Sequence, residues 1–434
     1  ASGQLDNQSG TVETIGGAGA LRVQAADIDN SKGRIVNAGS GATSIVSATN
    51  VLNTGVIGAN GALSIAALTM QNQASATVQA GAGLELAIRQ QLDNPGGISS
   101  VGALTFAQGA ATLNNPGRIA AGAAIDIAIL HANNDSGQIG TADGSGADVG
   151  LSAAEISNRG GKLVADRDLR LAALKAELDN SGGLIHAERD AAIAVAQTML
   201  NGAGVVETVG ANSKLGIDSD AIHNLSGSIV NSGKGDTQLR GRDEIVNTGI
   251  IAGNGQLGME AGTLINSGSV TSGARMRLKV DSLLDNSNLI SSASKLDISA
   301  ASPDVHNSGQ IYAGGDMTLQ GRHITNAGTI ATTPSSGGSV SIEGATLVND
   351  DGRIMASGDA SLQLTGAISN RLGVIQAGGD LELGAGDALD NTNGVIEAVG
   401  ASGTLQVRAH DINNSNGRIV NVGDDITVVA AATG

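Results

Sequence analysis

The stretch Asp27–Asn37, which reads DIDNSKGRIVN, decides the fold because its pattern recurs along the whole chain. The pattern is an Asn, a short polar turn, a Gly and then a pair of β-branched residues. Near the other end of the chain it returns almost unchanged as Asp411–Asn421, which reads DINNSNGRIVN. Recurrence of a short unit is typical of repeat architectures, in which each repeat is stabilised by its neighbours.

Each repeat contains one Asn at the equivalent position, which we call the anchor Asn. Successive anchors are separated by 19 to 24 residues. The twenty anchors are Asn7, Asn30, Asn53, Asn72, Asn94, Asn115, Asn134, Asn158, Asn180, Asn201, Asn224, Asn247, Asn266, Asn286, Asn307, Asn326, Asn349, Asn370, Asn391 and Asn414.

The list of intervals nearly repeats after nine units, so Asn7, Asn201 and Asn391 begin successive blocks. The blocks span about residues 1–194, 195–384 and 385–434, and the last one is partial. We interpret this longer period as the duplication of a nine-unit segment. A chain built from one repeating unit predicts a single elongated domain over residues 1–434.

The composition indicates an ordered chain with a narrow interior. Gly accounts for 65 of 434 residues, and the chain has one Phe, one Tyr and no Trp. An interior without aromatic rings must be a regular space that Ala, Val, Ile and Leu can fill. The hydrophobic share of 41% argues against disorder.

Charge and cysteine content exclude several classes of partner and site. The net charge is −17 and no run of Lys or Arg is present, so electrostatic repulsion argues against nucleic acid and anionic membrane surfaces as partners. The absence of Cys excludes disulfides and Cys-based zinc sites. The chain begins and ends inside the repeat pattern, so we expect it to be an excerpt from a longer protein.

Alternation of apolar and polar residues indicates short strands with one buried face, as in Leu84–Ile88 and Leu381–Leu383. Two or three strands of four to six residues for each unit predict an all-β fold, a right-handed parallel β-helix (solenoid) of about 20 rungs of roughly 21 residues. At a spacing of about 4.8 Å, these rungs would form a rod roughly 95 Å long.

Two segments depart from the simple pattern. Residues 163–178 are rich in helix-forming side chains, but their flanking anchors keep the rung spacing and Leu169, Leu171 and Ala173 alternate, so we predict a strand. The segment Asp135–Gly150 is rich in Gly, Asp and Ser and lies in the longest interval, so we predict a surface loop there.

The anchors are the most specific chemical feature, and we predict a structural role for them. Stacked amide side chains on consecutive rungs can donate to one another and form a ladder. Several anchors follow an Asp, which can accept hydrogen bonds from turn amides. These residues include Asp6, Asp93, Asp179, Asp285 and Asp390.

We predict no catalytic residue, no cofactor-binding residue and no metal site. Acidic residues are spread along the chain rather than gathered as in β-helical polysaccharide lyases and hydrolases. Gly314–Leu319 and Gly378–Leu383 are similar to the calcium-binding nonapeptide, but they do not recur every nine residues. His223 and His306 both precede an anchor, but four rungs separate them.

The rung motif resembles the haemagglutinin repeats of filamentous haemagglutinin. It is seen in LDNQSGTV at Leu5–Val12, LDNSGGLI at Leu178–Ile185 and LDNTNGVI at Leu389–Ile396, and the resemblance covers the whole chain. That family includes large exoproteins of Gram-negative two-partner secretion, among them adhesins and contact-dependent growth-inhibition toxins.

The resemblance implies a monomeric shaft of a secreted, cell-surface virulence adhesin, which holds a distal binding or toxin domain away from the cell. It also implies an outer-membrane secretion partner, recognised by an N-terminal domain outside this chain. In one alternative the shaft itself binds glycans or receptors of a host or neighbouring cell. In another it is the filament of a contact-dependent growth-inhibition toxin, and a β-helical polysaccharide lyase or hydrolase is the weakest reading.

The ladder hypothesis predicts different costs for inward and outward substitutions. Replacing the central anchor Asn247 by Leu should lower the melting temperature more than replacing the outward-facing Arg240, because only the anchor would hydrogen-bond between rungs. Equal melting temperatures for the two variants would contradict the ladder.

Overall fold

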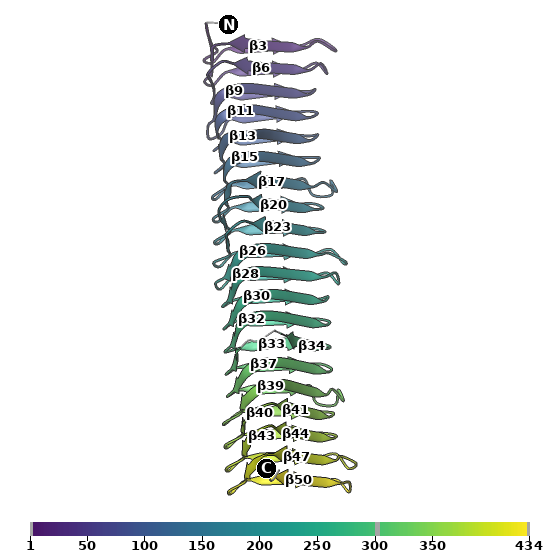
Figure 1. The fold of residues 1–434 in the computed structure, drawn as a ribbon. Helices are drawn as coiled ribbons and strands as arrows, with labels where there is room; N and C mark the ends of the chain where they lie inside the picture. Colours follow the sequence, from purple (N-terminus) through teal and green to yellow (C-terminus); the bar gives the residue numbers. More distant parts are fainter. Residues whose placement is uncertain (1–2, 300–303, 432–434) are drawn as a thin grey trace. The chain divides into compact units, whose positions relative to one another are not determined.

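The computed structural model describes residues 3–299 and 304–431, so the extreme ends of the predicted shaft, 1–2 and 432–434, lie outside it. The chain divides into two compact units. Within each unit the strands of successive rungs lie one above another (Figure 1). Unit 1 comprises Ala1–His223 and Gly227–Ser232, and unit 2 comprises Asn224–Ser226 and Gly233–Gly434. Over the described ranges, no helix is long and apolar enough to cross a membrane.

A rung of unit 1 consists of three strands, and each of them has an equivalent strand in the next rung. They are β3 (Leu21–Ala25), β4 (Asp27–Asn30) and β5 (Arg34–Asn37). Each pairs in parallel with its equivalent one rung later, namely β6 (Thr43–Ser47), β7 (Asn50–Asn53) and β8 (Val56–Ala59). Two stacks of parallel strands result: one contains β3, β4 and their equivalents, and the other contains the β5 equivalents.

Unit 2 is built in the same way. Strands β29 (Ile250–Gly253), β31 (Ser269–Ser272) and β33 (Leu289–Ser292) pair in parallel on one side of the rungs. Strands β41 (Ala360–Leu364), β44 (Leu381–Ala385) and β47 (Leu405–Ala409) do so on the other. The predicted parallel β-solenoid of about twenty turns is therefore confirmed, and its handedness stays a prediction.

Many strands are longer than the predicted four to six residues. In several rungs the two strands before the anchor fuse, as in β9 (Leu63–Asn72), β11 (Leu84–Asp93) and β13 (Leu104–Asn114). The chain still bends within them, because the pairing of β11 with β9 shifts register between Ile88 and Gln91. The backbone stays extended through the bend, so no turn interrupts the strand.

The core lies between the two stacks and is filled by one residue in two along each strand. On β10 (Thr77–Ala80), Val78 and Ala80 are buried while Thr77 and Gln79 are exposed. Parallel pairing in register stacks these apolar side chains into columns, of which one is Ile35, Ile57, Val78, Ile98 and Ile119. Such columns explain why the interior contains so little aromatic packing: Phe106 is the one buried ring among the described residues.

The structure decides both exceptional segments. Residues 163–178 are not helical: β19 (Lys162–Ala165) and β20 (Leu169–Ala173) confirm the strand prediction. The loop prediction for 135–150 is wrong in part, because β16 (Gln138–Thr141) lies inside it. Ile139 is fully buried and pairs with Ile119 and Leu163, so this strand keeps its place in the core and only residues 142–148 leave the rung.

Candidate functional site

The anchors lie at the corner where the chain passes from one stack of strands to the other. Asn30 ends β4 and Asn53 ends β7, and the strand that follows each of them belongs to the opposite stack. Unit 1 holds the ten anchors from Asn7 to Asn201, and unit 2 holds the ten from Asn224 to Asn414. All are at most 7% exposed except Asn414, which is exposed in the last described rung.

In each unit the structure joins all ten anchors into one hydrogen-bonded ladder. The Nδ2 of each anchor donates to the Oδ1 of the next, over 2.6 to 2.8 Å. Nδ2 also donates to a backbone carbonyl of the following rung, as from Asn30 to Val56 over 3.2 Å. Both donor positions are thereby engaged, which removes the cost of burying the amide.

The Gly of the motif is required by the ladder. After Asn30 the turn passes through Lys32, whose φ of 55° is in the left-handed region, and reaches Gly33. A Cβ on Gly33 would lie 2.1 Å from the carbonyl oxygen of Asn7 and 2.5 Å from Oδ1 of Asn30. The turn therefore packs against the ladder so closely that only Gly fits.

Carboxylates beside the anchors cap the turns, as predicted for three of the five Asp residues. The Oδ1 atoms of Asp6, Asp179 and Asp390 each accept a backbone N–H two residues later, over 2.9 to 3.1 Å. The Asp93 carboxylate instead accepts the side-chain amide of Gln91 at 2.9 Å. These contacts fix the turn locally, whereas the anchor fixes it to its neighbours.

A second kind of buried Asn was missed by the sequence analysis. Asn37, at the end of β5, is fully buried and its Nδ2 donates to the carbonyl oxygens of Gly19 and Gly41 over 3.0 and 3.1 Å. Its equivalent Asn231 is also fully buried and accepts from the hydroxyls of Thr208 and Ser213. The signal was the shared Ile-Val-Asn that closes each copy of the opening stretch.

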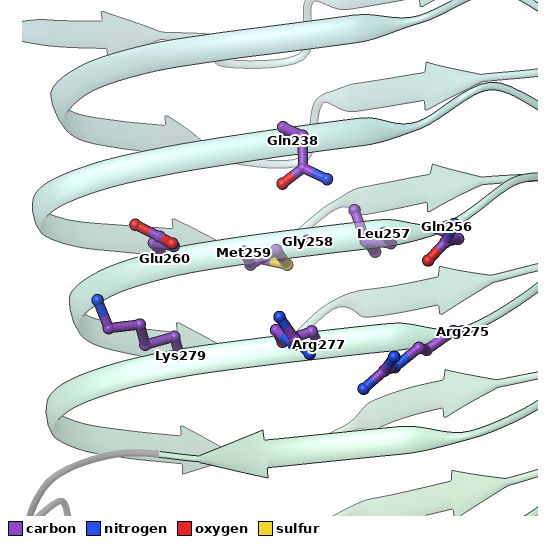
Figure 2. A pocket seen from close by; sticks show the side chains of 9 residues that line it. All are labelled: Gln238, Gln256, Leu257, Gly258, Met259, Glu260, Arg275, Arg277 and Lys279. Atoms are coloured by element: carbon purple, nitrogen blue, oxygen red, sulfur yellow. The ribbon is translucent and has the colours of Figure 1, made fainter.

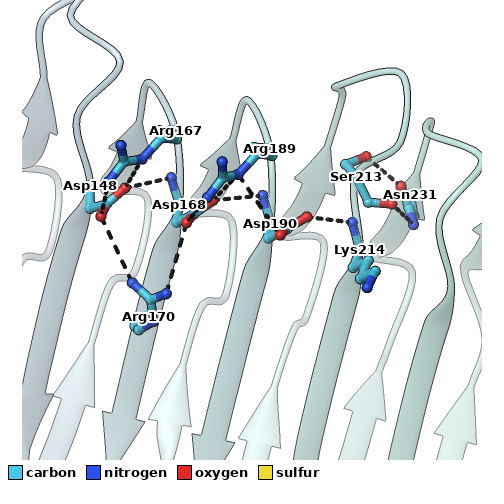
Figure 3. A network of polar contacts seen from close by, with 9 residues as sticks. All are labelled: Asp148, Arg167, Asp168, Arg170, Arg189, Asp190, Ser213, Lys214 and Asn231. Carbon is cyan, nitrogen blue, oxygen red and sulfur yellow. Dashed lines mark hydrogen bonds and ion pairs between the residues drawn. The ribbon is translucent and has the colours of Figure 1, made fainter.

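A staircase of carboxylates on successive rungs of unit 1 was also missed (Figure 3). The Oδ1 of Asp148 accepts the backbone N–H of Asp168 at 3.1 Å, and Oδ1 of Asp168 accepts that of Asp190 at 3.3 Å. The Oδ1 of Asp190 in turn accepts the N–H of Lys214 at 2.9 Å. Each carboxylate thus ties its own rung to the next one.

Arginine side chains bind this staircase. Arg167 contacts both carboxylate oxygens of Asp148, over 2.7 and 2.6 Å, and Arg189 does the same to Asp168. Arg170 lies between them, 3.9 Å from Asp148 and 3.8 Å from Asp168. The hydrogen bonds from Arg167 and Arg189 hold the pKa values of Asp148 and Asp168 below the usual range.

The segments that are similar to the calcium-binding nonapeptide use their Asp residues in the same way. The Oδ1 of Asp316 accepts the backbone N–H of Ser339 at 3.0 Å, and that of Asp380 accepts the N–H of Thr404 at 2.7 Å. Within residues 3–299 and 304–431 no group of three or more His, Asp or Glu side chains is placed to hold a metal ion. These carboxylates connect rungs.

Comparison with known families gives one match. The haemagglutinin repeat model matches residues 1–55, 40–96, 58–147, 232–301, 277–363, 335–402 and 400–433. Together these ranges cover well over half of the chain. No curated protein and no solved structure matches the chain.

The ladder predicts that Gly33 tolerates no side chain. Gly33→Ala should lower the free energy of unfolding by at least about 2 kcal/mol, because the new Cβ displaces a carbonyl or an anchor amide and leaves it buried without a partner. Gly58→Ala is the matched control, since its Cβ would come no closer than 3.8 Å to Val36. Urea denaturation measures both, and equal midpoints would contradict the close packing.

The staircase predicts acid sensitivity. A carboxylate with a lowered folded pKa adds stability that is fully present above its unfolded pKa, about 3.9, and is lost as the pH falls through the folded value. The melting temperature should therefore fall steeply below about pH 4. Asp168→Asn should lower the free energy of unfolding by about 1 to 3 kcal/mol at pH 7. It should also make the drop in melting temperature below about pH 4 smaller.

The more exposed Asp190, at 43%, supplies the control. Asp190→Asn should lower the free energy of unfolding at pH 7 by less than Asp168→Asn does, because water screens the more exposed carboxylate. A profile for Asp168→Asn that runs parallel to the parent from pH 7 to pH 3 would show that Asp168 does not titrate with folding.

Proposed function

Because the chain belongs to the haemagglutinin repeat family, whose members are secreted exoproteins with generally non-catalytic adhesin repeats, we propose that it is the structural shaft of a large Gram-negative surface adhesin. In this role it presents a distal binding or toxin domain away from the cell. The shaft reaches the surface through an outer-membrane secretion partner, and it performs no catalysis.

The observation that carries this proposal is the uniformity of the rungs within each unit. Every rung is joined to its neighbour by parallel strands on both stacks and by one anchor bond, as for Asn30 and Asn53 or Asn326 and Asn349. Bending such a stack requires these bonds to lengthen together along one side. A stiff spacer needs this resistance to bending, and it needs no binding or catalytic site.

The chemistry of the chain also suits export in the unfolded state. Without Cys, no disulfide forms before the chain has passed through a pore. Most backbone bonds join residues about one rung apart, as in the register of Leu21 with Thr43. Each emerging rung can then fold on the preceding one, and local folding of this kind draws the chain outward.

Small-angle scattering of the 434-residue chain tests the spacer role. We expect an elongated, β-rich monomer with a longest dimension on the order of 95 Å, from the strand spacing. Deleting residues 201–390 brings Asn391 into the place of Asn201, and it should shorten the particle by about 43 Å, the length of nine rungs.

Deletion of residues 212–390 is the out-of-phase control, because it leaves half a rung before Asn391. This variant should lose cooperative melting, while the in-phase deletion should keep it. A compact particle, or one whose longest dimension does not change on the in-phase deletion, would refute the spacer role.

A further inference from the structure

A basic hollow of about 200 Å³ opens on the outer face of unit 2 (Figure 2). It lies over three neighbouring strands, β28 (Thr237–Asn247), β30 (Leu257–Asn266) and β32 (Met276–Asn286). Nothing in the spacer role requires such a feature, because the core of these rungs is closed beneath it by buried side chains such as Leu257 and Met259.

The hollow exists because a Gly interrupts a column of long side chains. Parallel register places Gln238, Gly258 and Arg277 on three successive rungs, all facing outward. A Cβ on Gly258 would lie 2.2 Å from Oε1 of Gln238, so the Gln238 amide leans over the Gly. The adjacent column carries Glu260 and Lys279 on the second and third of these rungs.

The charge of the hollow is opposite to that of the chain. Its lining contains three cationic side chains and one carboxylate, a local charge of +2 in a chain of net charge −17. Arg275 is held at the rim by Asp297, to which its Nε donates over 2.9 Å. In the described part of the chain, the side chains of Arg277 and Lys279 form no hydrogen bond or ion pair.

We propose that this hollow binds a carboxylate-bearing sugar, a hexuronic acid residue of an acidic glycan. The planar guanidinium of Arg277 can hold a carboxylate through two parallel hydrogen bonds, and Lys279 adds a second positive charge. The amides of Gln238 and Gln256 and the carboxylate of Glu260 line the same space and provide donors and acceptors for ring hydroxyls.

The volume of the hollow and the charge of the chain limit which ligands can bind. The hollow is several times the roughly 30 Å³ that a water molecule occupies and is smaller than drug-sized pockets of about 300 Å³ and above, so it takes one sugar ring. The chain, with a net charge of −17, repels densely charged polyanions. A ligand with one carboxylate on each ring therefore fits better than a highly sulfated glycan or a nucleic acid.

A second hollow in unit 2 provides an internal comparison. Parallel register again places a Gln, a Gly and an Arg on successive rungs, here Gln363, Gly384 and Arg408. In this case the guanidinium lies 3.7 Å from the carboxylate of Glu382. Because Arg408 already has an anionic partner, we expect no acidic sugar to bind there.

Calorimetry with trigalacturonate and its methyl ester tests the proposal on the 434-residue chain. We expect a Kd in the millimolar range for the acid and no binding of the ester, which lacks the charge. The double variant Arg277→Gln with Lys279→Gln should lose at least tenfold in affinity, and Arg408→Gln, the matched control, should bind as the parent does.

Filling the hollow without changing its charge provides a second variant. Gly258→Ala should also lose at least tenfold, because the new Cβ occupies the floor and displaces Gln238. Equal binding of acid and ester, equal loss on Arg408→Gln, tighter binding of sulfated dextran than of trigalacturonate, or no binding by the parent chain would each overturn the proposal. The longest dimension of these variants in small-angle scattering should equal that of the parent chain. The binding experiment therefore tests the hollow independently of the spacer role.

Discussion

The fold depends on one repeated type of hydrogen bond, which joins the side-chain amides of anchors on successive rungs. Backbone pairing and the buried face alone do not fix where the next turn begins, since a shift of two residues along a strand keeps the same side chains inward and preserves many backbone hydrogen bonds. A buried amide cannot slip without losing its partner, which costs about 1 to 3 kcal/mol. The anchors therefore bring the chain back to the same corner although the intervals vary from 19 to 24 residues. Turn shape, the Gly at Gly33 and strand register all conform to that corner.

Much of this architecture was predictable because it is repeated. The recurrence of Asn and the alternation of apolar residues located the rungs, and the strand at Leu169–Ala173 followed from rung spacing in spite of its helical composition. The failure at Gln138–Thr141 has a physical cause: composition indicated a loop, but this strand buries the apolar side chain of Ile139 in the core. Fusion of strands at the bends left no mark in the sequence, because an extended backbone can curve without turn residues.

The polar contacts between rungs divide into two kinds with different predictability. Anchor contacts join identical residues, so spacing alone identifies them. Contacts such as Arg189 with Asp168 join different residues on different rungs, and they depend on the register at a corner where loops vary in length. The basic hollow is of this second kind, since it needs Gln238, Gly258 and Arg277 in one column. Such combinations become visible only when the rungs are aligned in space.

The ladder has a direction. In both units the donor belongs to the earlier rung and the acceptor to the later one, as from Asn7 to Asn30 and from Asn391 to Asn414. The latest turn to fold therefore always presents the same group, the Nδ2 donor of its anchor, as a template for the anchor of the segment that follows. This template is the same after any number of rungs, so nothing in it sets the final number of turns. Recombination can then add whole blocks without redesign, and the near-repetition after nine units is the expected trace of such growth.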